Sequence, residues 1–163
     1  MKKLYLAVCT LGCFSFINPA FGEGLKFEAE LSGAQEVANV LTDAEGTITV
    51  RFDDELTEVD VKLKVRDSAG TFARAHFHCA LPGENGPIAF GLVDPGPLAF
   101  DQGRVEGTLT NADYSGADCV PDIGRPVNNI AALAFAMREG LIYINIHSDV
   151  FPSGEIRGQL LED

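Results

Sequence analysis

Three histidines are the residues of this chain whose type and spacing are best suited to chemistry. His76 and His78 lie two residues apart in "RAHFHCALPGENGP", and His147 lies in "YINIHSD" near the end of the chain. Alternate residues of a β-strand point to the same face, so a His-x-His pair can chelate one ion. A third histidine from a neighbouring strand would complete a three-nitrogen site. Imidazole suits copper, zinc and nickel, and copper binds most strongly in the divalent first-row series. The histidines therefore predict a transition-metal site, with copper favoured and zinc as the alternative.

Further polar residues are expected on the same strand faces as the histidines. In "IYINIHS" the isoleucines form an apolar face, which leaves Tyr143 and Asn145 beside His147 on the other face. The same alternation directs Glu155 and Arg157 away from the core. We predict that Glu155 is a fourth ligand or orients a histidine that binds the metal. Tyr143, Asn145 and Arg157 complete the predicted binding face. The simplest alternative for Glu155 and Arg157 is a surface ion pair worth at most about 1 kcal/mol.

The same face also suits a function without a metal. Imidazoles on a sheet face can simply form hydrogen bonds, and a face that carries Tyr, Asn, Arg and Glu can bind a protein or a glycan. A non-enzymatic, extracytoplasmic interaction module is therefore the alternative function. Enzymatic activity is the weakest hypothesis, because Ser148 and Asp149 follow His147 directly and no nucleophile motif accompanies them.

Apolar and polar residues alternate with a period of two through most of the chain, and clusters of Gly, Asn, Asp and Pro interrupt them. This pattern is typical of antiparallel β-strands. The expected strands cover residues 25–33, 46–52, 58–65, 71–80, 87–93, 103–110, 141–148 and 154–161. Residues 128–140 predict one helix, which Asn128 or Asn129 caps and Gly140 ends. Residues 112–126 are expected to form a loop. The sequence therefore predicts an all-β protein, an antiparallel β-sandwich with Greek-key-like connections and one short helix.

The first 22 residues have the features of a secretory signal peptide. Two lysines precede an apolar run, and Ala20 and Gly22 are the small residues of a cleavage site. We predict cleavage after Gly22 and a single mature domain over residues 23–163, in the periplasm or secreted. Lipidation at Cys13 is the alternative. No later segment reaches the roughly 18 apolar residues of a membrane span.

The charge of the chain argues against two classes of partner. The formal net charge is −12 at pH 7, and removal of the two signal-peptide lysines makes it more negative still. Binding to nucleic acid or to anionic lipid requires Lys and Arg at the phosphates. We therefore expect neither a nucleic acid nor a membrane surface as partner, and a metal ion or an extracytoplasmic protein or glycan instead.

The cysteine content fits export. Two of the four cysteines lie in the predicted signal peptide, which leaves Cys79 and Cys119. Two cysteines in an oxidising compartment predict one disulfide. The alternative is a pair of free, buried thiols. The chain has no CxxC spacing, so neither redox catalysis nor a cysteine zinc site is indicated.

Three segments together resemble a CHRD domain, the module named after its repeats in the animal protein chordin and also widespread in exported bacterial proteins. They are "LSGAQEV", "AHFHCALPGENGP" and "GLIYINIHSDVFPSGEIRGQL", and the resemblance covers about residues 25–161. It implies a β-sandwich and an extracytoplasmic location, but little chemistry. The histidines of the family correspond to His76, His78 and His147, and its "GEIRG" to residues 154–158.

A weaker similarity is to Cu,Zn superoxide dismutase. That enzyme is also an antiparallel β-sandwich, with an HxH strand and a late copper-binding histidine, so the expected architecture is either immunoglobulin-like or like this enzyme. Its copper site, however, uses four histidines, and its zinc site requires more histidine and an aspartate. Three histidines in this chain cannot build both sites, so we do not expect dismutase activity.

Overall fold

The computed structural model of the protein describes residues 24–163. The predicted signal peptide, its cleavage after Gly22 and the alternative at Cys13 lie outside these residues. The described part contains all the expected strands and a short additional one after them. They are β1 (Lys26–Ser32), β2 (Glu45–Phe52), β3 (Glu58–Arg66), β4 (Phe72–Cys79), β5 (Ile88–Val93), β6 (Arg104–Thr110), β7 (Ile142–Ser148), β8 (Ile156–Gln159) and β9 (Leu161–Glu162).

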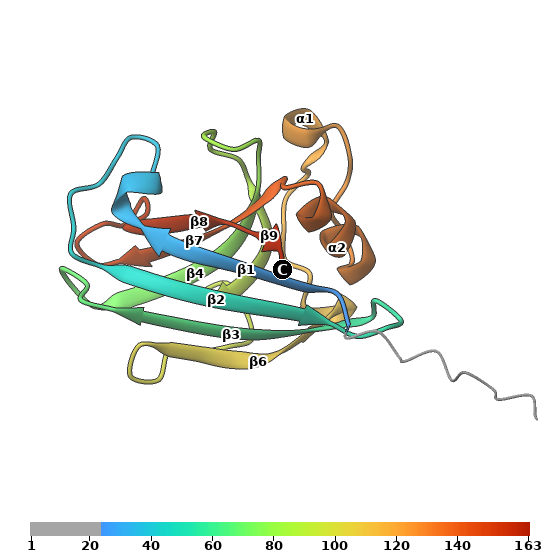
Figure 1. Cartoon of the computed structure of the whole chain (residues 1–163), viewed down its shortest axis with the longest axis horizontal. Coiled ribbons are helices and arrows are strands. Elements are labelled where there is room, and N and C mark those ends of the chain that lie inside the picture. The colour runs from blue at the N-terminus through green and yellow to red at the C-terminus, as the bar shows by residue number, and fades with distance from the viewer. Residues whose placement is uncertain (1–23) are drawn as a thin grey trace, which may run out of the picture.

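Within residues 24–163 the strands form one antiparallel sheet that curls around the core. The order is β5-β4-β7-β8-β1-β2-β3-β6, with β9 paired to β1. Figure 1 shows that the curl places β1, β2, β3 and β6 in one layer and β4 behind them, so that two layers face each other as in a sandwich. The all-β prediction is confirmed. The order matters for function because it makes β4 and β7 neighbours.

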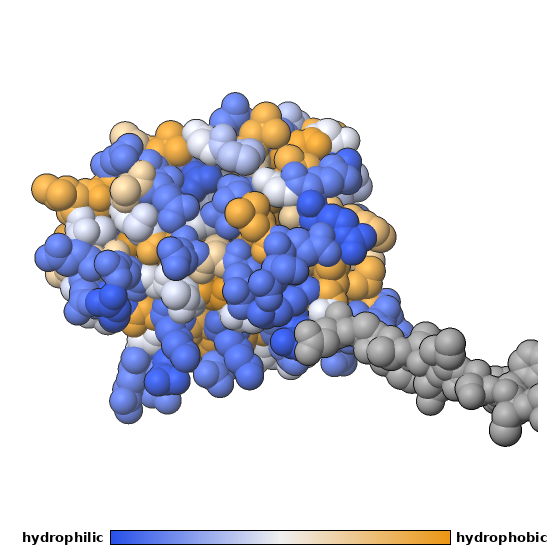
Figure 2. All heavy atoms as spheres, viewed as in Figure 1, coloured by the Kyte–Doolittle hydropathy of each residue, from blue (hydrophilic) through white to orange (hydrophobic). Residues whose placement is uncertain are grey.

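Strict alternation explains how one face of each strand enters the core. Along β3, exposed and buried residues alternate without interruption. The phenylalanines Phe27, Phe52, Phe77 and Phe90 are all buried inside the curl, and each such side chain stabilises the fold by about 1.5–3 kcal/mol through removal from water. The outer face of β1, β2 and β3 is mainly hydrophilic (Figure 2).

Strand β7 departs from this alternation, because all seven of its residues are buried. Its isoleucines face the core, and its second face carries Tyr143, Asn145 and His147. The β4–β5 loop and the β7–β8 turn cover this second face. The polar residues that the sequence pattern turns away from the core therefore lie in a second, polar interior.

The predicted helix is present as α2 (Ile130–Arg138). Asn129 caps it, since the side-chain oxygen accepts a hydrogen bond from the Ala132 N–H at 2.8 Å, and Gly140 follows its end with a φ of 68°. Glycine is favoured there because a positive φ brings a Cβ too close to the backbone, and glycine has no Cβ. A second helix, α1 (Val120–Ile123), occupies one turn of the segment predicted as a loop. Two single 3-10 turns complete the described elements, η1 (Gly33–Gln35) and η2 (Asn111–Asp113). No helix within residues 24–163 has the length and apolar character to cross a membrane.

The predicted disulfide joins Cys79 to Cys119. Cys79 ends β4 one residue after His78, and Cys119 directly precedes α1. Both residues are fully buried. The bond therefore fixes the end of the strand that carries two of the histidines to the segment before the helices.

Candidate metal centre

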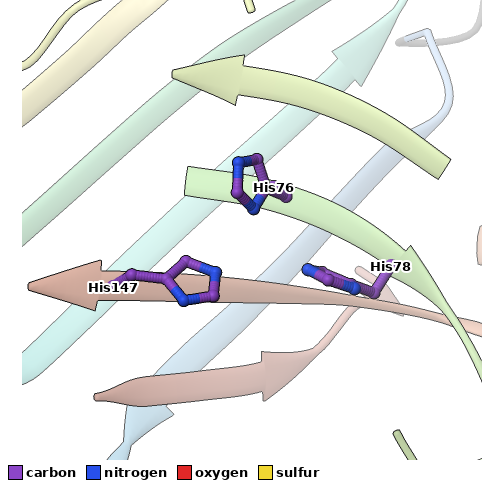
Figure 3. Close-up of side chains that lie close together, drawn as sticks. All are labelled: His76, His78 and His147. Atoms are coloured by element: carbon purple, nitrogen blue, oxygen red, sulfur yellow. The ribbon is translucent and has the colours of Figure 1, made fainter. Parts of the chain in front are cut away.

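Strand pairing brings the three histidines together. In the register of β4 with β7, His76 lies opposite Asn145, His78 opposite Tyr143, and Arg74 opposite His147. All these side chains are on the face that points away from the core. The ring centroid of His76 is 5.0 Å from that of His147 and 5.7 Å from that of His78. Figure 3 shows the rings of His76, His78 and His147 converging from the two strands.

Each imidazole uses one nitrogen for a hydrogen bond to a backbone carbonyl. His76 Nε2 lies 3.0 Å from the Asp94 oxygen, His78 Nδ1 lies 2.9 Å from the Gly86 oxygen, and His147 Nδ1 lies 3.1 Å from the Pro152 oxygen. A carbonyl only accepts, so the bonded nitrogen must carry the proton. In the neutral ring the other nitrogen then has no proton and carries a lone pair that can bind a metal. The three carbonyls thus select the tautomer of each histidine.

The second nitrogen of each ring is buried and has no hydrogen-bond partner. These atoms are His76 Nδ1, His78 Nε2 and His147 Nε2. One ring nitrogen from each histidine lies within 4.8 Å of the other two. An ion at 2.0–2.1 Å from each nitrogen requires them to be about 3.4 Å apart. Because the outer torsion of histidine is broad, small ring rotations can supply that closure.

Burial keeps the imidazoles uncharged. It lowers the pKa of His78 to about 4, helped by the charges of His76 and Arg157. It also lowers the pKa of His147 to about 4, with His76 and Arg74 acting in the same direction. The pKa of His76 is lowered mainly by burial as well. A neutral imidazole is the form that binds a metal, so near pH 7 no proton has to leave these rings first.

Tyr143 and Arg157 pack beside the histidines without entering their centre. The ring of Tyr143 stacks on that of His78 with centroids 5.0 Å apart, and the guanidinium of Arg157 lies 3.6 Å over the Tyr143 ring. Because β7 lies between β4 and β8, the tyrosine ring separates the cation from His78. Arg157 donates to the Glu84 carbonyl and to the Asn85 side chain. It therefore holds the β4–β5 loop over the site.

The β7–β8 turn closes the other side of the site. The Pro152 carbonyl accepts from Arg74 Nη2 at 2.8 Å and from His147. The turn is thus tied to β4 and β7 together, and it leaves His147 only 8% exposed. Two loops and two arginines consequently fix the rings from opposite sides.

The carboxylate of Glu155, the predicted fourth ligand or orienting residue, is bonded to donors other than the histidines and is not part of their cluster. Its carboxylate accepts from the Thr42 hydroxyl at 2.8 Å, the Ser68 hydroxyl at 2.6 Å and the Ala69 N–H at 2.9 Å. Burial acts to raise the pKa of Glu155, but hydrogen bonds from Ser148, and then from Ser68, Ala69 and Thr42, together lower it. The residue anchors the β1–β2 and β3–β4 loops. Within residues 24–163 it forms no ion pair with Arg157, which donates to the oxygens of Glu84 and Asn85 in the β4–β5 loop.

Glu36 is a buried acid that the sequence pattern did not single out. It follows η1, is 7% exposed, and accepts a hydrogen bond from Asn145 Nδ2 at 2.8 Å. Burial raises the pKa of Glu36 to about 7, against the opposing effects of Asn145 and Arg157. The signal that could have found it is its position in "LSGAQEV", directly before an otherwise exposed loop.

The comparison with protein families agrees with this architecture. A profile of the CHRD domain matches residues 27–160, which is nearly the whole described part. The chain belongs to the CHRD domain family. All three histidines, Glu36 and the disulfide lie within the matched range. A search among curated proteins found no match.

Proposed function

We propose that this CHRD domain protein binds one transition-metal ion through His76, His78 and His147, with copper favoured over zinc. The observation that carries the proposal is the different environment of the two nitrogens in each ring. One nitrogen is bound to a carbonyl, and the other is buried, unpartnered and directed into a common cluster. An unsatisfied buried polar atom costs about 1–3 kcal/mol, and native proteins contain few of them. A bound ion would satisfy all three.

The donor set supports copper. All three ligands are imidazoles, and the buried carboxylates Glu155 and Glu36 are occupied, the first by its own donors and the second by Asn145. Asp94, whose charge acts on His76, is exposed to solvent. Such a nitrogen site suits copper, zinc and nickel, and copper forms the strongest complexes among them. The backbone carbonyl that accepts from each imidazole N–H fixes the ring and raises the basicity of the other ring nitrogen as a ligand.

The burial of the remaining polar face argues against the alternative function. Tyr143, Asn145 and Arg157 are 2%, 4% and 2% exposed. A protein or glycan cannot reach these side chains unless the β4–β5 loop moves. A small ion is the ligand that fits a closed polar interior of this kind.

We further propose that the protein acts outside the cytoplasm, as a carrier or store of the ion. The disulfide between Cys79 and Cys119 supports this, because such bonds persist in oxidising compartments. Sequestration or delivery needs only reversible binding. It requires no nucleophilic residue.

Calorimetric titration with Cu²⁺ and with Zn²⁺, combined with elemental analysis, tests the proposal. We expect about one ion per chain and a dissociation constant below about 1 μM, with binding lost in His76→Ala/His78→Ala. Tyr114→Phe is the matched control, because it changes an aromatic residue that packs on Phe90 against the core and leaves the histidine face unchanged. Weak, non-stoichiometric binding that the double substitution leaves unchanged would refute the metal function.

A further inference from the structure

A buried carboxyl, that of Glu36, is bonded to Asn145, which lies on the same face of β7 as His147. Glu36 Oε1 is bonded to Asn145, and Asn145 lies opposite His76 on one neighbouring strand and opposite Arg157 on the other. The packing is close, because a Cβ at Gly154 would lie 2.7 Å from Asn145 Oδ1 and 3.0 Å from Glu36 Oε1. Glu36 is therefore held on Asn145 on the face that carries the histidines.

Among the described residues, Arg157 is the cation that acts on Glu36, and the acid that acts on a histidine of the site, Asp94 on His76, is exposed to solvent whereas Glu36 is buried. Arg157 lies on β8, and Glu36 in turn acts on Tyr143 of β7. His147 lies two residues along β7 from Asn145, the hydrogen-bond partner of Glu36. Glu155, the other buried carboxylate among the described residues, is occupied by Thr42, Ser68 and Ala69.

A divalent ion among three neutral imidazoles creates a charge problem. The rings contribute no negative charge, and the guanidiniums of Arg74 and Arg157 already act on His147 and His78. Two further positive charges in a buried site are stable only with a nearby anion, because desolvated charge is costly unless it is compensated.

We propose that Glu36 is the charge-balancing carboxylate of the metal site, held in position by Asn145, and that it releases its proton to solvent when the ion binds. The inference rests on the proposed function. In the exchange a divalent ion enters and the carboxylic proton leaves, and no other bond forms or breaks. Glu36 acts as a positioning residue through charge and does not touch the ion.

Proton counting tests this directly. Cu²⁺ is added to the purified, lightly buffered protein at pH 6 and at pH 8, and the base needed to hold the pH is measured. With a pKa of about 7 for Glu36, we expect release of about 0.9 proton per ion at pH 6 and about 0.1 at pH 8. Metal affinity should fall about tenfold from pH 8 to pH 6. Ionisation of a metal-bound water gives the opposite trend, with more release at the higher pH.

Two variants separate the inference from the proposed function. In Glu36→Gln, which keeps the shape and an acceptor for Asn145, Cu²⁺ should still bind, without proton release at pH 6 and with equal affinity at both pH values. Glu106→Gln, which changes an exposed acid of β6 away from the site, should behave as the wild type. Stoichiometric wild-type binding with no release at pH 6, or release that persists in Glu36→Gln, overturns the inference and leaves the metal site intact. Absence of wild-type binding overturns both.

Discussion

Acid should destabilise the metal-free protein through its histidines, in a pH range where few other groups titrate. The chain has only three histidines, all of them in the site. In the unfolded chain imidazoles titrate near pH 6.5, whereas in the folded protein the pKa values of His78 and His147 are about 4. Between these values the unfolded state binds more protons. Stability is therefore full above about pH 6.5 and is lost as the pH falls toward 4.

Glu36 acts in the opposite direction. Its pKa is about 7 in the folded protein and about 4.5 when unfolded, so the folded state takes up this proton first as the pH falls. The proton on Glu36 thus favours folding between about pH 7 and pH 4.5. The two effects overlap, and their difference sets the slope of stability with pH.

The magnitudes follow from proton linkage. From pH 6.5 to pH 5.5, His78 and His147 should each remove about 1 kcal/mol from the free energy of unfolding, and Glu36 should return about 1 kcal/mol. His76 adds to the loss, because burial lowers its pKa too. The wild type should therefore lose about 1–2 kcal/mol, and Glu36→Gln about 2–3 kcal/mol.

Urea denaturation at a series of pH values, with a chelator present, measures these slopes. Glu106→Gln serves as the control, because its side chain is exposed on β6, and it should follow the wild type. A free energy of unfolding that is constant or rises from pH 6.5 to pH 5.5 would refute the account of neutral, buried histidines. Equal slopes for the wild type and Glu36→Gln would refute the account of Glu36.

Two other predictions concern the frame of the site. The double substitution Cys79→Ala/Cys119→Ala removes a cross-link between residues 40 apart in sequence, and should lower the free energy of unfolding in urea by about 4 kcal/mol; a loss below about 1 kcal/mol would contradict the disulfide. Gly154→Ala should destabilise by about 1–3 kcal/mol, because the new Cβ meets Asn145 and φ is 133°. Gly83→Ala, where φ is also positive but no atom lies within 4 Å, should cost clearly less, and equal losses would show that the contact with Asn145 is unimportant.

The sequence predicted the faces of the strands well, because side-chain direction in a strand depends only on parity. The isoleucines of β7 had to face one side and Tyr143, Asn145 and His147 the other, and the structure has them so. The cap of α2 was equally local, since Asn129 bonds an N–H three residues later. Such features need no knowledge of the rest of the chain.

What the sequence could not supply was the position of partners that are distant along the chain. Nothing in the pattern pairs β4 with β7, which lie side by side only because of the sheet order. Glu155 lies between the turn at Gly154 and β8. Its donors from the β1–β2 and β3–β4 loops are 86 to 113 residues away along the sequence. Glu36 meets Asn145 across 109 residues. Its burial depends on that long-range packing, and its neighbours in sequence are mostly exposed.

X-ray absorption at the copper edge of the copper-loaded protein tests the central claim most directly, because it reports which atoms surround the ion. We predict scattering from about three imidazole rings, with nitrogens near 2.0 Å. In His147→Gln the count should fall to about two rings, while the pair on β4 is retained. A shell of oxygen atoms without imidazole scattering, or a spectrum that His147→Gln leaves unchanged, would contradict the three-histidine site.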